Sequence, residues 1–285
     1  MLFDRPLINS NILRQTKSQI YIAPHPLLSH YIAHYTVSFP IINPPKDTAE
    51  ISKEKKFLTL IPDASGCMIY TYENDRISQH MWGPTTKIVK VENDSDASVY
   101  RFFIEFLPGG LHALTGITQS ELSDTQYGIG EVDSALSQAL MKVIESAKDL
   151  NEVIERMNTI FLKAIDSRRK TYTDLSPLLN YIKYYKGSFQ VKDLAADYYI
   201  SHRHLNRLFE RHIGMNVKQF ARLVRINKTV DLYKTKSYSA SKEVAQALGF
   251  FDESHLIRDF KELCGTTPNA FLKNMSNFYN EPFKY

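Results

Sequence analysis

Two six-residue segments in the last third of this 285-residue chain repeat each other and place an arginine at the same position. Residues 204–209 read HLNRLF and recur 51 residues later as HLIRDF at 255–260, so Arg207 and Arg258 correspond. An arginine guanidinium donates two parallel hydrogen bonds to O6 and N7 of guanine and also binds phosphate. One such segment fits a helical hairpin that only packs against its neighbours, but two copies favour DNA binding.

The residues around the first copy predict a helix-turn-helix. A helix is expected over 191–197 and a turn over 198–200, with Ser201 as the N-cap of a second helix that begins at His202. Leu205, Leu208 and Phe209 then share one side of the second helix, which directs polar and basic side chains outward.

The second copy predicts the same unit. Gly249 supplies the turn and Asp252 is the expected N-cap. Upstream, the sequence DLA at 193–195 matches EVA at 243–245 with an offset of 50, so one extra residue lies between the matched blocks. A turn between two helices tolerates such an insertion.

These two helices and the segment that follows the first of them supply nine candidate DNA contacts. The expected readers of base edges are Arg203, Asn206, Arg207, Ser254, Ile257 and Arg258, and the expected phosphate contacts are Arg211, Lys218 and Lys261.

The charge distribution agrees with a polyanion as the partner. Residues 176–276 carry 16 Lys and Arg against 9 Asp and Glu, a net charge of +7. The whole chain has a net charge of +4, so the remaining residues together carry −3. An ordinary lysine-rich surface would give the same asymmetry, which therefore supports the repeat without replacing it.

Residues 178–272 resemble the tandem helix-turn-helix domain of the AraC family of bacterial transcription regulators. The matching positions in the first unit are Asp193, Leu194, Ala195, Ser201, Leu205, Arg207, Phe209 and Gly214, followed by Arg225 in the connecting helix. The matching positions in the second unit are Glu243, Val244, Ala245, Gly249, Phe250, Asp252, Ser254, Arg258, Phe260, Lys261, Gly265, Thr267, Pro268 and Phe271. The resemblance implies two recognition helices joined by a long helix over 217–233, which enter successive major-groove segments about 34 Å apart.

Three residues depart from the family pattern. Tyr199 stands where the first turn commonly has glycine, Thr229 replaces a usual alanine, and Val217 stands where the second copy has Pro268. A bulky residue is costly in a left-handed conformation, so the first turn is expected to differ in shape from the second.

The amino-terminal half predicts strands and then helices. Short aromatic or β-branched runs at 57–62, 67–72, 86–91 and 98–106 are separated by turn residues at 63–66, 73–75 and 93–96, as in an antiparallel sandwich or barrel. The 3, 4, 7 spacing of apolar residues over 27–35 predicts a short helix, and apolar stripes over 132–144 and 153–162 predict two more.

The composition shift at 166–174 marks the expected linker. The expected domains are therefore a sensor domain over 1–165, a linker over 166–174 and a tandem helix-turn-helix domain over 175–276.

Residues 21–165 are similar to the sensor region in one branch of the same family. The matching positions are Tyr21, Pro24, Leu27, Tyr31, Ile32, Tyr35, Leu60, Pro62, Asp63, Gly83, Pro84, Phe106, Pro108, Gly109, Gly110, Leu114, Gly116, Glu121, Leu122 and Asp124. The resemblance implies an α+β protein with an amino-terminal antiparallel β-barrel of the cupin type, flanking helices and an all-α carboxyl-terminal domain.

The sequence offers little evidence of an enzyme active site. His30 and His34 are four apart on the expected helix, but no third metal ligand is nearby, and Ser65 lacks the Gly-x-Ser-x-Gly elbow of a nucleophile. The two cysteines, Cys67 and Cys264, are interpreted as packed thiols. The alternatives to a regulator are a DNA-tethered β-barrel enzyme and a constitutive architectural DNA binder without a ligand.

Composition and the amino-terminal residues predict an ordinary globular protein of the cytoplasm. Apolar residues make up 43% of the chain, charged residues 23%, and no run of apolar residues is long enough for a membrane span or a signal peptide. The expected partner is double-stranded DNA. A small-molecule effector, RNA polymerase and a second copy of the chain are further candidate partners, and no metal, cofactor or membrane is expected.

Overall fold

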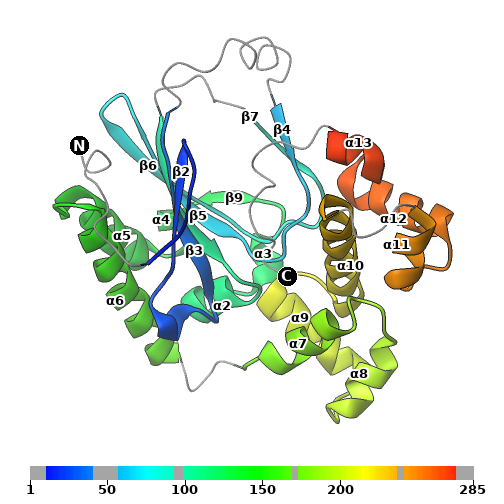
Figure 1. Ribbon diagram of the computed structural model, residues 1–285. Coiled ribbons are helices and arrows are strands. Elements are labelled where there is room, and N and C mark those ends of the chain that lie inside the picture. The colour runs from blue at the N-terminus through cyan, green and yellow to red at the C-terminus, as the bar shows by residue number, and fades with distance from the viewer. Residues whose placement is uncertain (1–10, 41–56, 93–98, 169–172, 236–240, 274–285) are drawn as a thin grey trace.

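A computed structural model describes residues 11–40, 57–92, 99–168, 173–235 and 241–273 of the chain. A sheet-rich amino-terminal part is followed by a helical carboxyl-terminal part (Figure 1). A seven-stranded antiparallel sheet has the strand order β1-β2-β3-β8-β5-β6-β9, and β4 and β7 form a separate antiparallel pair. The strands are β1 (Ile12–Gln15), β2 (Gln19–Ile22), β3 (Ile32–Ser38), β4 (Phe57–Leu60), β5 (Cys67–Glu73), β6 (Arg76–Trp82), β7 (Val89–Glu92), β8 (Tyr100–Phe106) and β9 (Gln126–Gly128).

The fold is of the α+β class with an antiparallel sheet, as the sequence predicts. Among the described strands, β1 and β9 are the two edges of the larger sheet and do not pair with each other, so the sheet is open. Closure into a barrel is therefore the detail in which the structure differs from the expectation.

The helix predicted over 27–35 is wrong. A 3-10 helix, η2 (Pro26–Leu28), is followed by β3, which lies inside the sheet between β2 and β8. A strand buried on both faces reads as a nearly continuous apolar run, and such a run can imitate helical spacing. His34 lies in β3, buried and edge-on to Tyr21, so it does not share a helix face with His30.

Three of the four predicted strands are confirmed as β4, β5 and β8, and the fourth overlaps β7. The two-residue turn Asn74-Asp75 has positive φ angles of 48° and 60° and joins β5 to β6, a hairpin partner that the sequence analysis missed. The turn predicted at 93–96 lies outside the described residues, as does the part of the expected linker at 169–172.

Helices cover the larger sheet, with α5 and α6 running side by side along it (Figure 1). The hydroxyl of Tyr35 donates to Asn158 of α6 at 2.7 Å, and the amide of Gln79 donates to Ser137 of α5 at 2.6 Å. The helices of this part are α2 (Gly110–Thr115), α3 (Gln119–Leu122), α4 (Ile129–Val132), α5 (Ser134–Ser146) and α6 (Leu150–Arg168). The two predicted apolar stripes are thus α5 and α6, and α6 includes the first residues of the expected linker.

The carboxyl-terminal part has two hydrophobic cores, and each includes a residue from the amino-terminal part. One core, around Phe209 and Phe220, includes Ala64, and the other, around Phe260 and Phe271, includes Ile61. The helices are α7 (Ser176–Tyr184), α8 (Val191–Asp197), α9 (His202–Ile213), α10 (Val217–Lys234), α11 (Ser241–Ala247), α12 (Glu253–Cys264) and α13 (Pro268–Lys273). Packing therefore connects the sheet-rich part to both helical cores.

Candidate DNA-binding surface

The first helix-turn-helix unit forms as predicted from α8 and α9. The Ser201 hydroxyl accepts a hydrogen bond from the backbone N–H of His204 at 3.1 Å, so Ser201 is the N-cap of α9. Leu205 and Phe209 are fully buried. The apolar stripe thus fixes the rotation of α9 and leaves its opposite side in solvent.

The second unit is formed by α11 and α12. The Asp252 carboxylate accepts from the backbone N–H of His255 at 2.6 Å and caps α12. Leu256, Phe260 and Cys264 are buried on one side of this helix. Burial raises the pKa of the Cys264 thiol to about 12, which agrees with the interpretation of a packed thiol.

The two turns have the same shape, and the expected difference at Tyr199 is wrong. Tyr199 has φ +54° and Gly249 has φ +68°. The next residue donates from its backbone N–H to the matching alanine in each unit, from Ile200 to Ala195 at 3.0 Å and from Phe250 to Ala245 at 2.9 Å. Tyr199 adopts the left-handed conformation with its side chain 96% exposed, because the surrounding hydrogen bonds require that backbone.

Replacing Tyr199 with glycine is expected to stabilise the protein by about 0.5–1 kcal/mol, because relief of left-handed strain exceeds the entropy that glycine loses. Gly249→Ala is expected to act in the opposite direction, since a Cβ at Gly249 would lie 2.0 Å from the Ser188 hydroxyl oxygen. Thermal unfolding of both variants tests this. A lower melting temperature for Tyr199→Gly would show that the turn is not strained.

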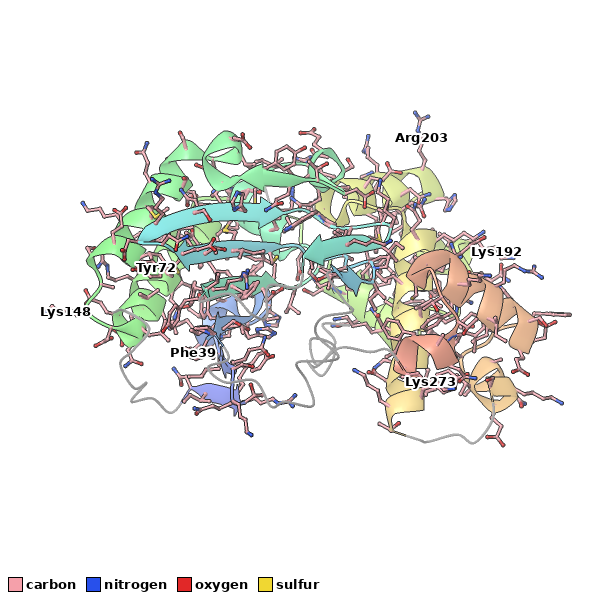
Figure 2. The ribbon with its side chains drawn as sticks, turned by 90° about the horizontal axis from the view of Figure 1, so that it is seen from above. Phe39, Tyr72, Lys148, Lys192, Arg203 and Lys273 are labelled. Atoms are coloured by element: carbon pink, nitrogen blue, oxygen red, sulfur yellow. The ribbon has the colours of Figure 1, made fainter. Side chains whose placement is uncertain are left out.

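The nine predicted DNA contacts lie in the described part of the chain and are accessible. The exposed members are Arg203, Arg207, Arg211, Lys218, Ser254, Arg258 and Lys261, and the half-buried members are Asn206 and Ile257. Figure 2 shows Arg203 pointing away from α9 into solvent. The matched pair Arg207 and Arg258 is exposed in both units, as the repeat requires.

The α9 side chains form a shared polar surface. His202, Arg203, Asn206, Arg207 and Glu210 line one open hollow. A guanidinium nitrogen of Arg207 lies 2.9 Å from His204 Nδ1. Basic and amide side chains are therefore gathered on the side of α9 that faces solvent.

Asn206 has a structural role that the sequence analysis did not anticipate. Its carboxamide oxygen accepts from the backbone N–H of Val217 at 3.2 Å, at the start of α10. Asn216 and Gln219 form a capping box at the same helix end, and Phe209 packs against Phe220. These contacts join α9 to the amino-terminal end of α10.

Helix α12 is joined to α10 by a group of charged residues that we call the clamp, consisting of Arg222, Arg225, Asp259 and Glu262. Arg222 donates to the carboxylates of both Asp259 and Glu262. Arg225 approaches the other carboxylate oxygen of Asp259 at 3.6 Å, and its guanidinium carbon lies 4.6 Å from the centre of the Phe250 ring. The clamp holds α12 against α10.

Of the four clamp residues, Arg225 was expected only from the family resemblance, and Arg222, Asp259 and Glu262 were not expected. Arg222 and Asp259 are 37 positions apart, so the pairing leaves no local pattern. The only signal was an acidic residue, Asp259, at the position where the first unit has Leu208.

The amino-terminal part contacts the carboxyl-terminal ends of both α9 and α12. The Ser123 hydroxyl donates to the backbone oxygen of Gly214 at 3.0 Å, and a Cβ on Gly214 would lie 3.0 Å from Pro84. At the matching cap of α12, a Cβ on Gly265 would lie 3.0 Å from the Ile88 side chain. The segment 84–88 therefore reaches both helix ends, and we call it the bridge.

Two buried histidines meet at the first of these contacts. The rings of His112 on α2 and His212 on α9 have centroids 4.1 Å apart. His112 Nδ1 lies 2.7 Å from the backbone oxygen of Ile117. Burial, His112 and Arg211 lower the pKa of His212 to about 4, and burial, Arg211 and Arg168 lower the pKa of His112.

Acid is expected to destabilise the folded chain through this pair. The unfolded state, with an ordinary histidine pKa of about 6.5, takes up protons first as the pH falls. Above pH 6.5 the pair does not change the free energy of unfolding. Between pH 6.5 and pH 4, protonation of His212 in the unfolded state lowers the free energy of unfolding by up to about 3 kcal/mol. Urea unfolding across this range measures the loss. His212→Gln should make the free energy of unfolding depend less on pH, whereas His202→Gln, the control at an exposed site, should leave the dependence unchanged. An unchanged pH dependence in His212→Gln would show that the loss of stability in acid does not come from His212.

The described residues hold no group of three or more side chains suited to a metal ion. Within the same ranges, no helix has the length and apolar character of a membrane span.

Two family models match the chain. Residues 194–274 match a model described as a helix-turn-helix domain, and residues 21–127 match one described as a domain of unknown function, DUF6597.

Two relatives and one solved structure extend the comparison. The chain is 34% identical over 82 residues to the HTH-type transcriptional regulator YfiF of Bacillus subtilis, and the aligned segment covers 29% of this chain and 26% of the relative. It is 25% identical over 138 residues to the Msm operon regulatory protein of Streptococcus mutans, and the aligned segment covers 48% of this chain and 49% of the relative. The chain thus spans about half or less of the length of these curated relatives. The crystal structure of ToxT from Vibrio cholerae aligns with 15% identity and a TM-score of 0.40, over 77% of this chain and 94% of ToxT.

A duplicated helix-turn-helix with a basic residue at the same exposed position in each copy defines a DNA-binding class of domain. The match over residues 194–274 agrees with the two helix-turn-helix units that the structure shows there. Both named relatives are regulatory proteins.

Proposed function

We propose that this protein is a sequence-specific DNA-binding transcription regulator that places α9 and α12 in successive major-groove segments on one face of the double helix. The observation that carries the proposal is the exposure of Arg207 and Arg258 at matching positions of two units joined to one helix, α10. Because both recognition helices belong to one chain, a monomer can contact two groove segments without dimerising.

The nine exposed or half-buried side chains named above divide into two roles in this proposal. Arg203, Asn206 and Arg207 on α9 and Ser254, Ile257 and Arg258 on α12 contact base edges. Arg211, Lys218 and Lys261 contact phosphates, so replacing one of them should reduce the slope of log affinity against log salt by about 1 without changing sequence preference.

Selection of duplexes from a random pool, followed by sequencing, tests sequence specificity. The proposal expects an enriched site with two conserved blocks whose centres are about 10 base pairs apart. Enrichment of no sequence would contradict it, and this outcome would favour an architectural binder instead.

Regulation is proposed to pass through the contacts between the amino-terminal part and the ends of α9 and α12. A ligand or a second copy of the chain that shifts the bridge would move both recognition helices together, since Pro84 and Ile88 adjoin matching helix caps. A thermal-shift screen of small metabolites can identify a ligand, because binding to the folded state alone raises the melting temperature.

The variant Ile61→Asp tests the route of regulation. Ile61 is 7% exposed and packs in the core of the second unit, so a carboxylate there should separate the two parts. A ligand found in the screen should change DNA affinity in the wild-type protein and not in Ile61→Asp. An equal change in both proteins would exclude this route.

A further inference from the structure

The two helix-turn-helix units differ in length by one residue, and the structure locates the extra residue at Phe251. The left-handed turn residues Tyr199 and Gly249 are 50 positions apart, whereas the N-caps Ser201 and Asp252 are 51 apart. The residue after each left-handed position makes the same backbone hydrogen bond in both units. Phe251 is therefore the residue that has no counterpart in the first unit.

The Phe251 ring is placed in solvent by ordered neighbours on both sides. Phe250, before it, is 5% exposed and lies under the Arg225 guanidinium, whereas Phe251 is 92% exposed. Its backbone N–H donates to His255 Nδ1 at 3.3 Å, and Asp252, after it, caps α12. A phenyl ring in this position contributes almost nothing to the hydrophobic core, so core packing does not account for it.

We propose that Phe251 contacts the C5-methyl group of a thymine in the DNA segment that α12 reads. The inference rests on the proposed function, because the amino-terminal end of a recognition helix is the end that approaches base edges. The thymine methyl is the apolar feature of the major groove, and apolar side chains, phenylalanine among them, recognise it.

The neighbouring charges favour a base edge over the phosphate backbone as the partner. Asp252 and Glu253 follow Phe251 and are exposed. Phosphates repel carboxylates, whereas a carboxylate in the major groove accepts a hydrogen bond from the N4 amino group of cytosine. Ser254 and Arg258, on the same helix, are the polar base contacts already proposed. The start of α12 thus combines an apolar contact with hydrogen-bonding groups.

A double-mutant cycle between protein and DNA tests the contact. The wild-type chain first selects its operator from a random duplex pool. Each thymine in the half-site of α12 is then replaced, one at a time, by deoxyuridine, which lacks only the methyl group. One replacement is expected to weaken wild-type binding about fourfold, the worth of one buried methyl group.

The variant Phe251→Ala should bind the thymine and deoxyuridine duplexes equally, and Phe251→Leu should restore part of the difference. Leu27→Ala, which removes a side chain 69% exposed on the amino-terminal part, is the matched control and should keep the fourfold difference. If no thymine position shows a loss that depends on Phe251, the inference is overturned while the proposed function stands. If the wild-type chain selects no sequence, the proposed function fails and this inference fails with it.

Discussion

Replacing both Arg207 and Arg258 with alanine is expected to weaken specific DNA binding at least about thirtyfold, while binding to unrelated DNA falls much less. Each bidentate arginine contact to guanine contributes about 1–3 kcal/mol of discrimination, so the loss of two contacts removes at least about 2 kcal/mol. Both side chains are exposed, and the variant should fold with the stability of the wild type.

The single variants separate the two half-sites. Arg207→Ala should relax base preference only in the block read by α9, and Arg258→Ala only in the block read by α12. Arg76→Ala, which removes an exposed arginine from β6, is the matched control for the loss of one positive charge. Fluorescence anisotropy at one fixed salt concentration measures the DNA affinity of these four variants and of the wild type. Wild-type affinity in the double variant would remove both arginines from the DNA-binding surface.

Removing Asp259 is expected to have the largest effect on stability, because the clamp depends on it. Its side chain is 11% exposed and pairs with Arg222 and Arg225, whose side chains are 27% and 18% exposed. Truncation of a buried partner leaves the opposite charge without compensation, so Asp259→Ala should lower the free energy of unfolding by about 2–4 kcal/mol. Operator affinity should fall as well, since α12 is no longer held against α10.

The clamp itself supplies a matched control. Glu262 pairs with Arg222 from the exposed side of α12, where its side chain is 64% exposed. Exposed ion pairs contribute about 0–1 kcal/mol, so Glu262→Ala should be nearly neutral. Asp259→Asn keeps the size of the side chain, so its free energy of unfolding should lie between those of Asp259→Ala and Glu262→Ala. Equal urea midpoints for Asp259→Ala and Glu262→Ala would show that the clamp does not hold α12.

The sequence predicted the helical part well because its signals are local. The caps Ser201 and Asp252, the glycine turn at Gly249 and the apolar spacing within α9 and α12 each depend on residues within a few positions of one another. Both bounds of α8 agree with the prediction for the same reason, whereas the start of α10 at Val217 agrees with what the family resemblance implied.

Features that depend on distant residues were not predictable from one sequence. A helix was predicted where β3 lies because both faces of this strand are largely buried, which removes the alternation that identifies a strand. The contact from Ser123 to Gly214 joins residues 91 positions apart. Tyr199 was expected to change its turn, but the surrounding hydrogen bonds impose the left-handed backbone that its side chain disfavours.

Hydroxyl-radical and methylation-protection footprinting of the wild-type chain on its selected operator shows whether both α9 and α12 enter the major groove. We expect two protected major-groove segments, centred one helical turn apart on the same face of the duplex, with Arg258→Ala losing protection at guanines of one segment only. A single protected segment, or two segments on opposite faces, would contradict it.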